Sequence, residues 1–185
     1  HRVLATDIFL DGEDGLGAFD RYRQLLANGV ERAQADMEAL PLADAQFDLV
    51  VAAGAIHYVR DVALPVAEAY RLLREQGLFL VLDSPVYRRP DDGRAMVSRR
   101  VREHWRTYGV SPAPELQSGF LLLPDFVRLL RQTGFAVDLR HPFDGVERTV
   151  RRWLAQRLAR PIPAVFTVFV ASKPGAERSR WEQER

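Results

Sequence analysis

Residues 35–58 read A-D-M-E-A-L-P-L-A-D-A-Q-F-D-L-V-V-A-A-G-A-I-H-Y and set the architecture of the chain. The apolar run 49–53 is too short for a helix and rich in valine, so it predicts a buried parallel strand that ends at Gly54. Asp36 follows another short segment, 31–35, which we expect to be the preceding strand. Ligands of open α/β sheets bind outside the carboxyl ends of the strands, so Asp36 and Gly54 mark a predicted binding edge.

The rest of the chain alternates strands and helices in the same way. Apolar residues at helical spacing predict helices, and short alternating or β-branched runs predict strands. We expect strands at 2–8, 31–35, 47–53, 78–83, 135–140 and 165–172, and helices at 18–28, 61–76, 93–108, 124–133 and 146–159. This order predicts an α/β layered domain with a doubly wound, mostly parallel sheet.

The composition excludes several classes of protein. The chain has 185 residues, of which 47% are hydrophobic, which is enough for one sizeable core. A net charge of +1 argues against a dedicated nucleic-acid binder. The absence of cysteine excludes disulfides and thiolate metal sites, and we expect no metal. Because the sequence has no signal peptide and no apolar run of membrane-spanning length, we expect a cytoplasmic protein; its oligomeric state is not predicted.

The acidic, glycine-containing segment 11–17 is a candidate phosphate-binding loop, and we reject that interpretation. Its glycines do not have the G-x-G-x-x-G spacing, and its three acids would repel a pyrophosphate. We expect a turn that leads into the helix 18–28.

The opening stretch resembles the class I S-adenosylmethionine-dependent methyltransferases, in particular their small-molecule (type 11-like) branch with the pattern D-x-E-x-L-P-x-x-D-x-x-F-D-x-V. The matching residues are Asp36, Glu38, Leu40, Pro41, Asp44, Phe47, Asp48 and Val50. The resemblance covers roughly 2–174 and implies a Rossmann-like sheet whose last strand is antiparallel. The family's first strand and glycine-rich loop should precede Arg2, so we expect an N-terminally incomplete methyltransferase-like domain over 1–174, with 175–185 as a charged tail.

The resemblance implies S-adenosylmethionine as the cofactor and assigns residues to it. Asp7 matches the acid that accepts hydrogen bonds from both ribose hydroxyls, a task that suits a carboxylate because it accepts two donors at once. Ile8 matches the neighbour that packs on the adenine. The full expected cofactor-binding set is Asp7, Ile8, Asp36, Met37, Ala53 and Gly54.

The resemblance also implies which segments face a small-molecule acceptor. The loop that follows Gly54 lines the pocket near the reactive methyl group, where His57 is either a general base or part of the wall. The segment 88–119 is expected to be a lid-like insertion, although its arginines could equally form a solvated helix face. The expected acceptor-binding residues are Tyr58, Tyr87, Arg88 and Arg89.

Three functions are compatible with these features. The first is a methyltransferase acting on a small organic acceptor. The second is a non-catalytic remnant of the same fold that lacks useful cofactor binding. The third is a nicotinamide-dependent enzyme on a related sheet, which is disfavoured because no G-x-G-x-x-G follows a strand.

Overall fold

The computed structural model of the chain describes residues 2–13, 15–22, 30–112, 119–141, 157 and 162–175. The chain divides into two compact units, His1–Ala43 and Asp44–Arg185, and each is described by itself. Except for Arg157, the expected helix 146–159 lies outside the described residues, as does the expected tail from 176 onward.

The first unit contains two parallel strands and a short helix. β1 (Leu4–Asp7) pairs with β2 (Glu31–Gln34), and both confirm expected strands. The 3-10 helix η1 (Leu16–Tyr22) starts two residues before the expected helix, whose remainder from 23 lies outside the described residues. The acidic turn folds back on β1: Leu16 N donates to Phe9 O at 3.0 Å, and a Cβ on Gly15 would stand 2.6 Å from that same oxygen. Position 15 therefore requires glycine, because a larger side chain would collide with the backbone of Phe9.

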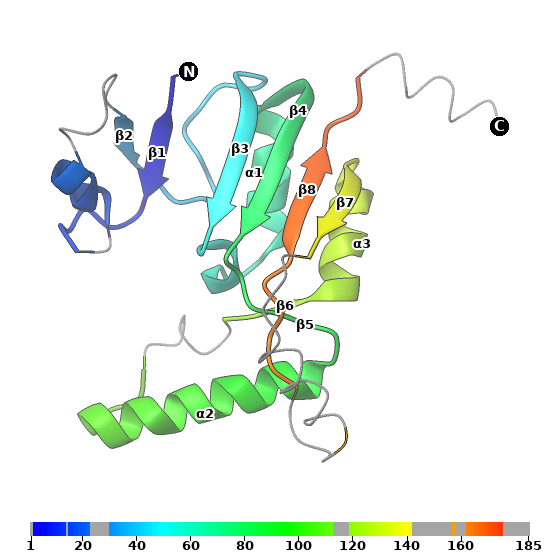
Figure 1. Ribbon diagram of the computed structural model, residues 1–185. Helices are drawn as coiled ribbons and strands as arrows, with labels where there is room; N and C mark the ends of the chain where they lie inside the picture. Colours follow the sequence, from blue (N-terminus) through cyan, green and yellow to red (C-terminus); the bar gives the residue numbers. More distant parts are fainter. Residues whose placement is uncertain are drawn as a thin grey trace. The chain divides into compact units, whose positions relative to one another are not determined.

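The second unit is built on a four-stranded mixed sheet in the order β3-β4-β8-β7 (Figure 1). β3 (Phe47–Ala53) and β4 (Leu73–Leu82) are parallel, as expected. β8 (Val168–Ser172) is antiparallel to both β4 and β7 (Ala136–Arg140), between which it lies. The antiparallel last strand is therefore confirmed. Its regular pairing begins later than the expected 165, where Val165 makes only an isolated bridge to Val86.

Two helices cover one face of this sheet and enclose the core. α1 (Ala63–Leu72) and α3 (Leu123–Thr133) pack on the face that carries Phe79 and Val81. Phe126 of α3 meets Phe169 of β8 edge-on, with ring centroids 4.9 Å apart. Each helix buries its apolar side against this face of the sheet, which is why amphipathic helical segments alternate with strands in the sequence.

The expectation that residues 49–53 are buried is wrong for one face of β3. We predicted that residues 49–53 form a buried strand, and the segment is a strand, yet the Leu49 and Val51 side chains are 47% and 48% exposed. Successive side chains of a strand point to opposite faces. Val50 and Ala52 therefore meet the core, while Leu49 and Val51 lie on the opposite face of β3 and remain about half exposed.

The boundary between α1 and β4 is also different from the expectation. The helix ends at Leu72 rather than at Gln76, and the strand begins at once. The last helical carbonyls find partners elsewhere: Gln46 N donates to Leu72 O at 2.9 Å, and Lys173 Nζ donates to the carbonyls of Tyr70 and Leu73 at 2.9 and 2.8 Å. These distant partners end the helix, and hydrophobic periodicity cannot reveal them.

A two-stranded parallel sheet and a long helix follow β4. β5 (Val86–Tyr87) pairs with β6 (Leu121–Leu122), and α2 (Pro90–Tyr108) lies beyond the carboxyl ends of β3 and β4 (Figure 1). α2 begins three residues before the expected 93, because proline is suited to the first turn of a helix. Gly93 packs this helix against Phe120.

Candidate active site

Two expected cofactor acids lie at one edge of the first unit. Asp7 is the last residue of β1, and Asp36 lies two residues after β2. Because the two strands are parallel, both acids stand at their carboxyl edge. Asp7 Oδ1 accepts from Phe9 N at 2.9 Å, and Asp36 Oδ1 accepts from Glu38 N at 2.9 Å. The described residues offer no donor to Oδ2 of either acid, which leaves each carboxylate one oxygen for a ligand.

The neighbours of these acids also have the exposure that a ligand-binding role needs. Ile8 is 51% exposed, so its apolar side chain is accessible to a flat partner. Met37 is partly buried. Ile8 O accepts from the Gln34 side chain at 3.0 Å, which ties the segment after β1 to the end of β2. Contact with the cofactor stays a prediction for both residues.

Gly54 joins the carboxyl ends of β3 and β4 in the second unit. Its φ of +63° lies in the left-handed region, where glycine costs least. Its N–H donates to Leu82 O at 3.0 Å, which locks the end of β3 to the end of β4. Ala53, the last residue of β3, is exposed beside it. The sharp turn at Gly54 directs the chain into η2 (Ile56–Tyr58), which carries His57.

His57 forms a buried polar pair with Ser84, a residue that the sequence interpretation missed. The two side chains are 6% and 0% exposed, and His57 Nδ1 lies 3.1 Å from Ser84 Oγ. Ser84 Oγ also donates to Leu82 O at 3.4 Å. The only available signal for Ser84 was its place directly after a predicted strand at the ligand-binding edge.

Burial makes His57 a neutral imidazole near pH 7. Desolvation, together with the smaller effect of the positive charge of Arg100, lowers the pKa of His57 to about 4. Arg100 belongs to α2 and is partly buried. In the sequence Arg100 is one of the many arginines of the segment 88–119, and nothing there places it near His57.

The expected acceptor residues occupy different environments. Tyr58 is 39% exposed, and its ring lies 4.0 Å from that of His57. Tyr87 is 6% exposed and packs edge-on against Phe120, so burial raises the pKa of its phenol, with Arg99 and Arg100 acting in the opposite direction.

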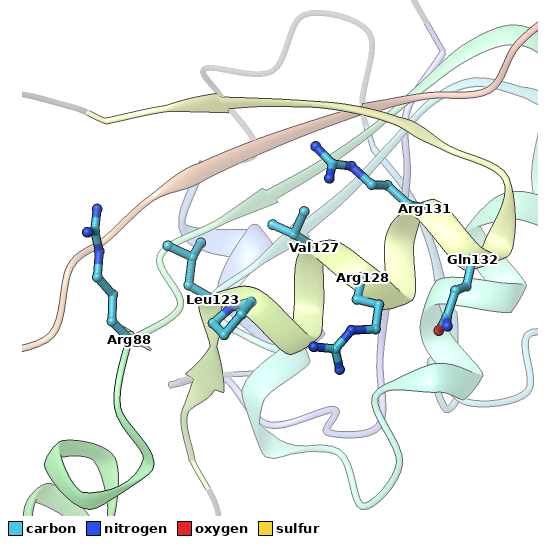
Figure 2. Close-up of a pocket in the computed structure, with 7 residues that line it drawn as sticks. Arg88, Leu123, Val127, Arg128, Arg131 and Gln132 are labelled. Atoms are coloured by element: carbon cyan, nitrogen blue, oxygen red, sulfur yellow. The ribbon is translucent and has the colours of Figure 1, made fainter.

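Arg88 lines a pocket along α3 whose lining includes neither His57 nor Tyr58. Figure 2 shows its guanidinium at one end of a pocket of about 750 Å³ along α3. The lining consists of Arg88, Leu123, Pro124, Val127, Arg128, Arg131 and Gln132. Arg89 is exposed and occupies the N-cap position of α2 without a side-chain capping hydrogen bond. Acceptor binding by Arg88 and Arg89 stays a prediction.

The donor set fits one part of the expected cofactor. A strand-end carboxylate with a free oxygen suits the paired hydroxyls of a ribose, and Asp7 has that arrangement. Within the described ranges, no cluster of His, Asp or Glu could hold a metal ion. In the same part of the chain, none of the helices has the length and apolar character that crossing a bilayer needs.

Comparison with known proteins gives one family match and several similar structures. Residues 3–81 match the family described as methyltransferase domain. A search of curated proteins finds no match. Among solved structures, an S-adenosylmethionine-dependent methyltransferase from Mesorhizobium loti is 22% identical over 93% of this chain and 80% of its own, with a TM-score of 0.59.

Two further solved structures agree. An S-adenosylmethionine-dependent methyltransferase from Methanosarcina mazei is 13% identical, covers 94% of this chain and 82% of its own, and has a TM-score of 0.58. The YcgJ protein from Bacillus subtilis is 15% identical over 95% and 83%, with a TM-score of 0.63. At these identities the likeness shows the fold, and the match over residues 3–81 makes this chain similar to the methyltransferase domains.

Proposed function

We propose that the chain transfers the methyl group of S-adenosylmethionine to a small organic acceptor, and that His57 accepts the acceptor's proton. The observation that carries this proposal is a neutral, largely buried imidazole held directly after the glycine turn that ends β3. Bound S-adenosylmethionine supplies a methyl group on a positively charged sulfur, and its displacement depends on positioning and on exclusion of water.

The chain's own residues divide the work in this proposal. Asp7 and Asp36 bind and orient the cofactor through their free carboxylate oxygens, with Ile8 and Met37 as apolar contacts. In this proposal Ala53 and Gly54, at the turn that ends β3, also contact the cofactor.

The acceptor side of the proposal involves fewer contacts. His57 removes the proton, and Tyr58 stacks beside it as a flat wall. We propose that the insertion 88–119 is a lid over this site and that Arg88 and Arg89 attract an anionic group on the acceptor. Arg100 supports a lid role for α2, because its charge acts on both His57 and Tyr87.

Two experiments test this function. Calorimetric titration measures the binding of S-adenosylmethionine and of its demethylated product. Transfer assays then follow an isotopic label from the cofactor to a panel of small phenols, amines and carboxylic acids. We expect binding of the cofactor and a labelled product whose formation falls by roughly 100-fold or more in His57→Gln, the scale of general-base catalysis. A folded chain that binds neither cofactor form contradicts the proposal. The comparisons favour neither the remnant nor the nicotinamide alternative.

A further inference from the structure

The pair formed by His57 and Ser84 allows two arrangements of hydrogen atoms. In the first, His57 Nδ1–H donates to Ser84 Oγ, and the serine hydroxyl donates to Leu82 O. In the second, the serine donates to an unprotonated Nδ1, so its bond to Leu82 O is lost and Nε2 carries the hydrogen. The distances of 3.1 and 3.4 Å accommodate both bonds of the first arrangement at once.

The first arrangement satisfies more buried groups. It gives the serine oxygen one donor and one acceptor, which matches the capacity of a hydroxyl. Leu82 O then accepts from both Gly54 N and Ser84 Oγ, one for each lone pair of a carbonyl. Because Ser84 is fully buried, no water replaces a bond that the second arrangement gives up. The network therefore favours hydrogen on Nδ1.

The other nitrogen of the ring, Nε2, is accessible to a ligand. Within the described part of the chain, no fully buried side-chain nitrogen or oxygen lacks a partner, and Nε2 of His57 makes no hydrogen bond there. Nε2 therefore reaches the surface although the ring as a whole is only 6% exposed. The groups beside the ring are Tyr58, Ser84 and the cation Arg100. Since the cation opposes protonation of the ring, Nε2 keeps its lone pair.

We propose that Ser84 is the positioning residue that holds His57 in the Nδ1–H tautomer, so that the accessible Nε2 lone pair accepts the proton of the methyl acceptor. This proposal rests on the function proposed above. In the step, the acceptor's lone pair forms a bond to the methyl carbon while the carbon–sulfur bond breaks and leaves its electron pair on sulfur. The acceptor's proton moves to Nε2, and the resulting imidazolium still donates from Nδ1 to Ser84 Oγ.

Tautomer measurement on the whole chain tests the role of Ser84 without any acceptor. Long-range proton–nitrogen NMR of the ¹⁵N-labelled protein at pH 7 distinguishes a protonated from an unprotonated ring nitrogen, and His57→Gln assigns the signals among the four histidines. We expect Nδ1 protonated and Nε2 unprotonated. In Ser84→Ala, loss of the acceptor should move the tautomer ratio toward Nε2–H by roughly five- to tenfold, the effect of one hydrogen bond on an equilibrium.

Two further variants separate this role from a general structural one. Ser84→Thr keeps the hydroxyl and should retain the Nδ1–H tautomer. Ser172→Ala, which removes a serine hydroxyl bonded to Ala136 O in β7 instead, should leave the tautomer unchanged. Circular dichroism confirms that each variant is folded, and if Ser84→Ala is not, the wild-type tautomer alone decides. An Nε2–H tautomer in the wild type, or an unchanged ratio in folded Ser84→Ala, overturns the proposal.

Activity measurements distinguish a failure of the positioning role of Ser84 from a failure of His57 as the base. Ser84→Ala should lower kcat while the acceptor KM stays within about twofold, and Ser84→Thr should restore it. Full activity in His57→Gln defeats the proposed base even if the tautomer result holds. The expected tautomer in the wild type with an unchanged kcat in Ser84→Ala defeats the positioning role alone.

Discussion

Individual residues of the family pattern have different physical tasks. Asp44 and Asp48 accept hydrogen bonds from Arg71 and Arg74 at 2.6 and 2.8 Å, and Arg71 also binds Glu68. Asp44 ties the loop before β3 to the end of α1, and Asp48 ties the start of β3 to β4. Asp36 has no such ion pair among the described residues and uses one oxygen locally. The pattern therefore combines anchoring acids with an acid that remains available for a ligand.

Asp7 provides a prediction about the cofactor. Asp7→Ala should weaken S-adenosylmethionine binding by about 1.5–3 kcal/mol, because it removes hydrogen bonds to a charged acceptor. Calorimetry measures the change. The matched control is Asp138→Ala, which removes an exposed acid that is paired with Arg140 instead. Equal affinities for Asp7→Ala and the wild type would exclude the ribose role.

His57 provides a prediction about pH. The neutral form dominates in the folded protein down to about pH 4, whereas an unfolded histidine gains its proton near 6.5. The unfolded state therefore binds more protons between these values, and the His57 contribution to stability is complete above 6.5 and lost as the pH falls toward 4. Urea unfolding should show a loss of up to about 3 kcal/mol over this window. His57→Gln should remove that part of the pH dependence, and identical slopes would contradict it.

Lys173 shows how one residue can link two elements. It follows β8 directly, donates to the Tyr70 and Leu73 carbonyls, and lies over the Tyr70 ring at 4.5 Å. Lys173→Met keeps the aliphatic stem but removes both bonds at the end of α1. We expect a loss of about 1.5–3 kcal/mol in chemical unfolding, the range for hydrogen bonds to charged groups. Lys173→Arg should recover part of it, and a neutral Lys173→Met would show that water replaces these bonds.

At the level of elements, α2 is fixed to the unit at its first turn. Asp92 is 8% exposed and accepts from Ile162 N at 2.9 Å, and Gly93 lies against the Phe120 ring. The far end of the helix is exposed, with Trp105 and Tyr108 at 56% and 67%. The first turn therefore attaches the helix to the rest of the unit, and its last turns present Trp105 and Tyr108 to solvent.

A substitution at Gly93 tests this anchor. Alanine normally stabilises a helix interior by about 0.5–1 kcal/mol relative to glycine. Here its Cβ would stand 2.3 Å from Phe120 Cε2, so Gly93→Ala should instead destabilise the protein by about 1–3 kcal/mol. Adding Phe120→Leu should relieve the clash, so the double variant should lose less than the sum of the single ones. Strict additivity in urea unfolding would exclude the contact.

At the level of the whole molecule, we expect the β3-β4-β8-β7 sheet and the β1-β2 sheet to differ in local stability, because their strands have different numbers of neighbouring strands. β4 and β8 each have strands on both sides, whereas β1 and β2 pair only with each other among the described residues. Hydrogen-exchange mass spectrometry should therefore find the slowest exchange in β4 and β8, because opening them requires breaking two ladders and the core. Equal or slower exchange in β1 and β2 would contradict this prediction.

The sequence by itself determined the α/β class and the strand 47–53, because hydrophobic periodicity is a local signal. The antiparallel β8 was implied by the family resemblance that the D-x-E-x-L-P pattern carries. The sequence also predicted that Asp7 and Asp36 follow parallel strands. Tertiary structure alone decided that α1 stops at Leu72, because Gln46 and Lys173 supply its final partners from distant parts of the chain. It likewise decided the pairing of His57 with Ser84, since a hydrogen bond across 27 residues depends on how two strand ends meet.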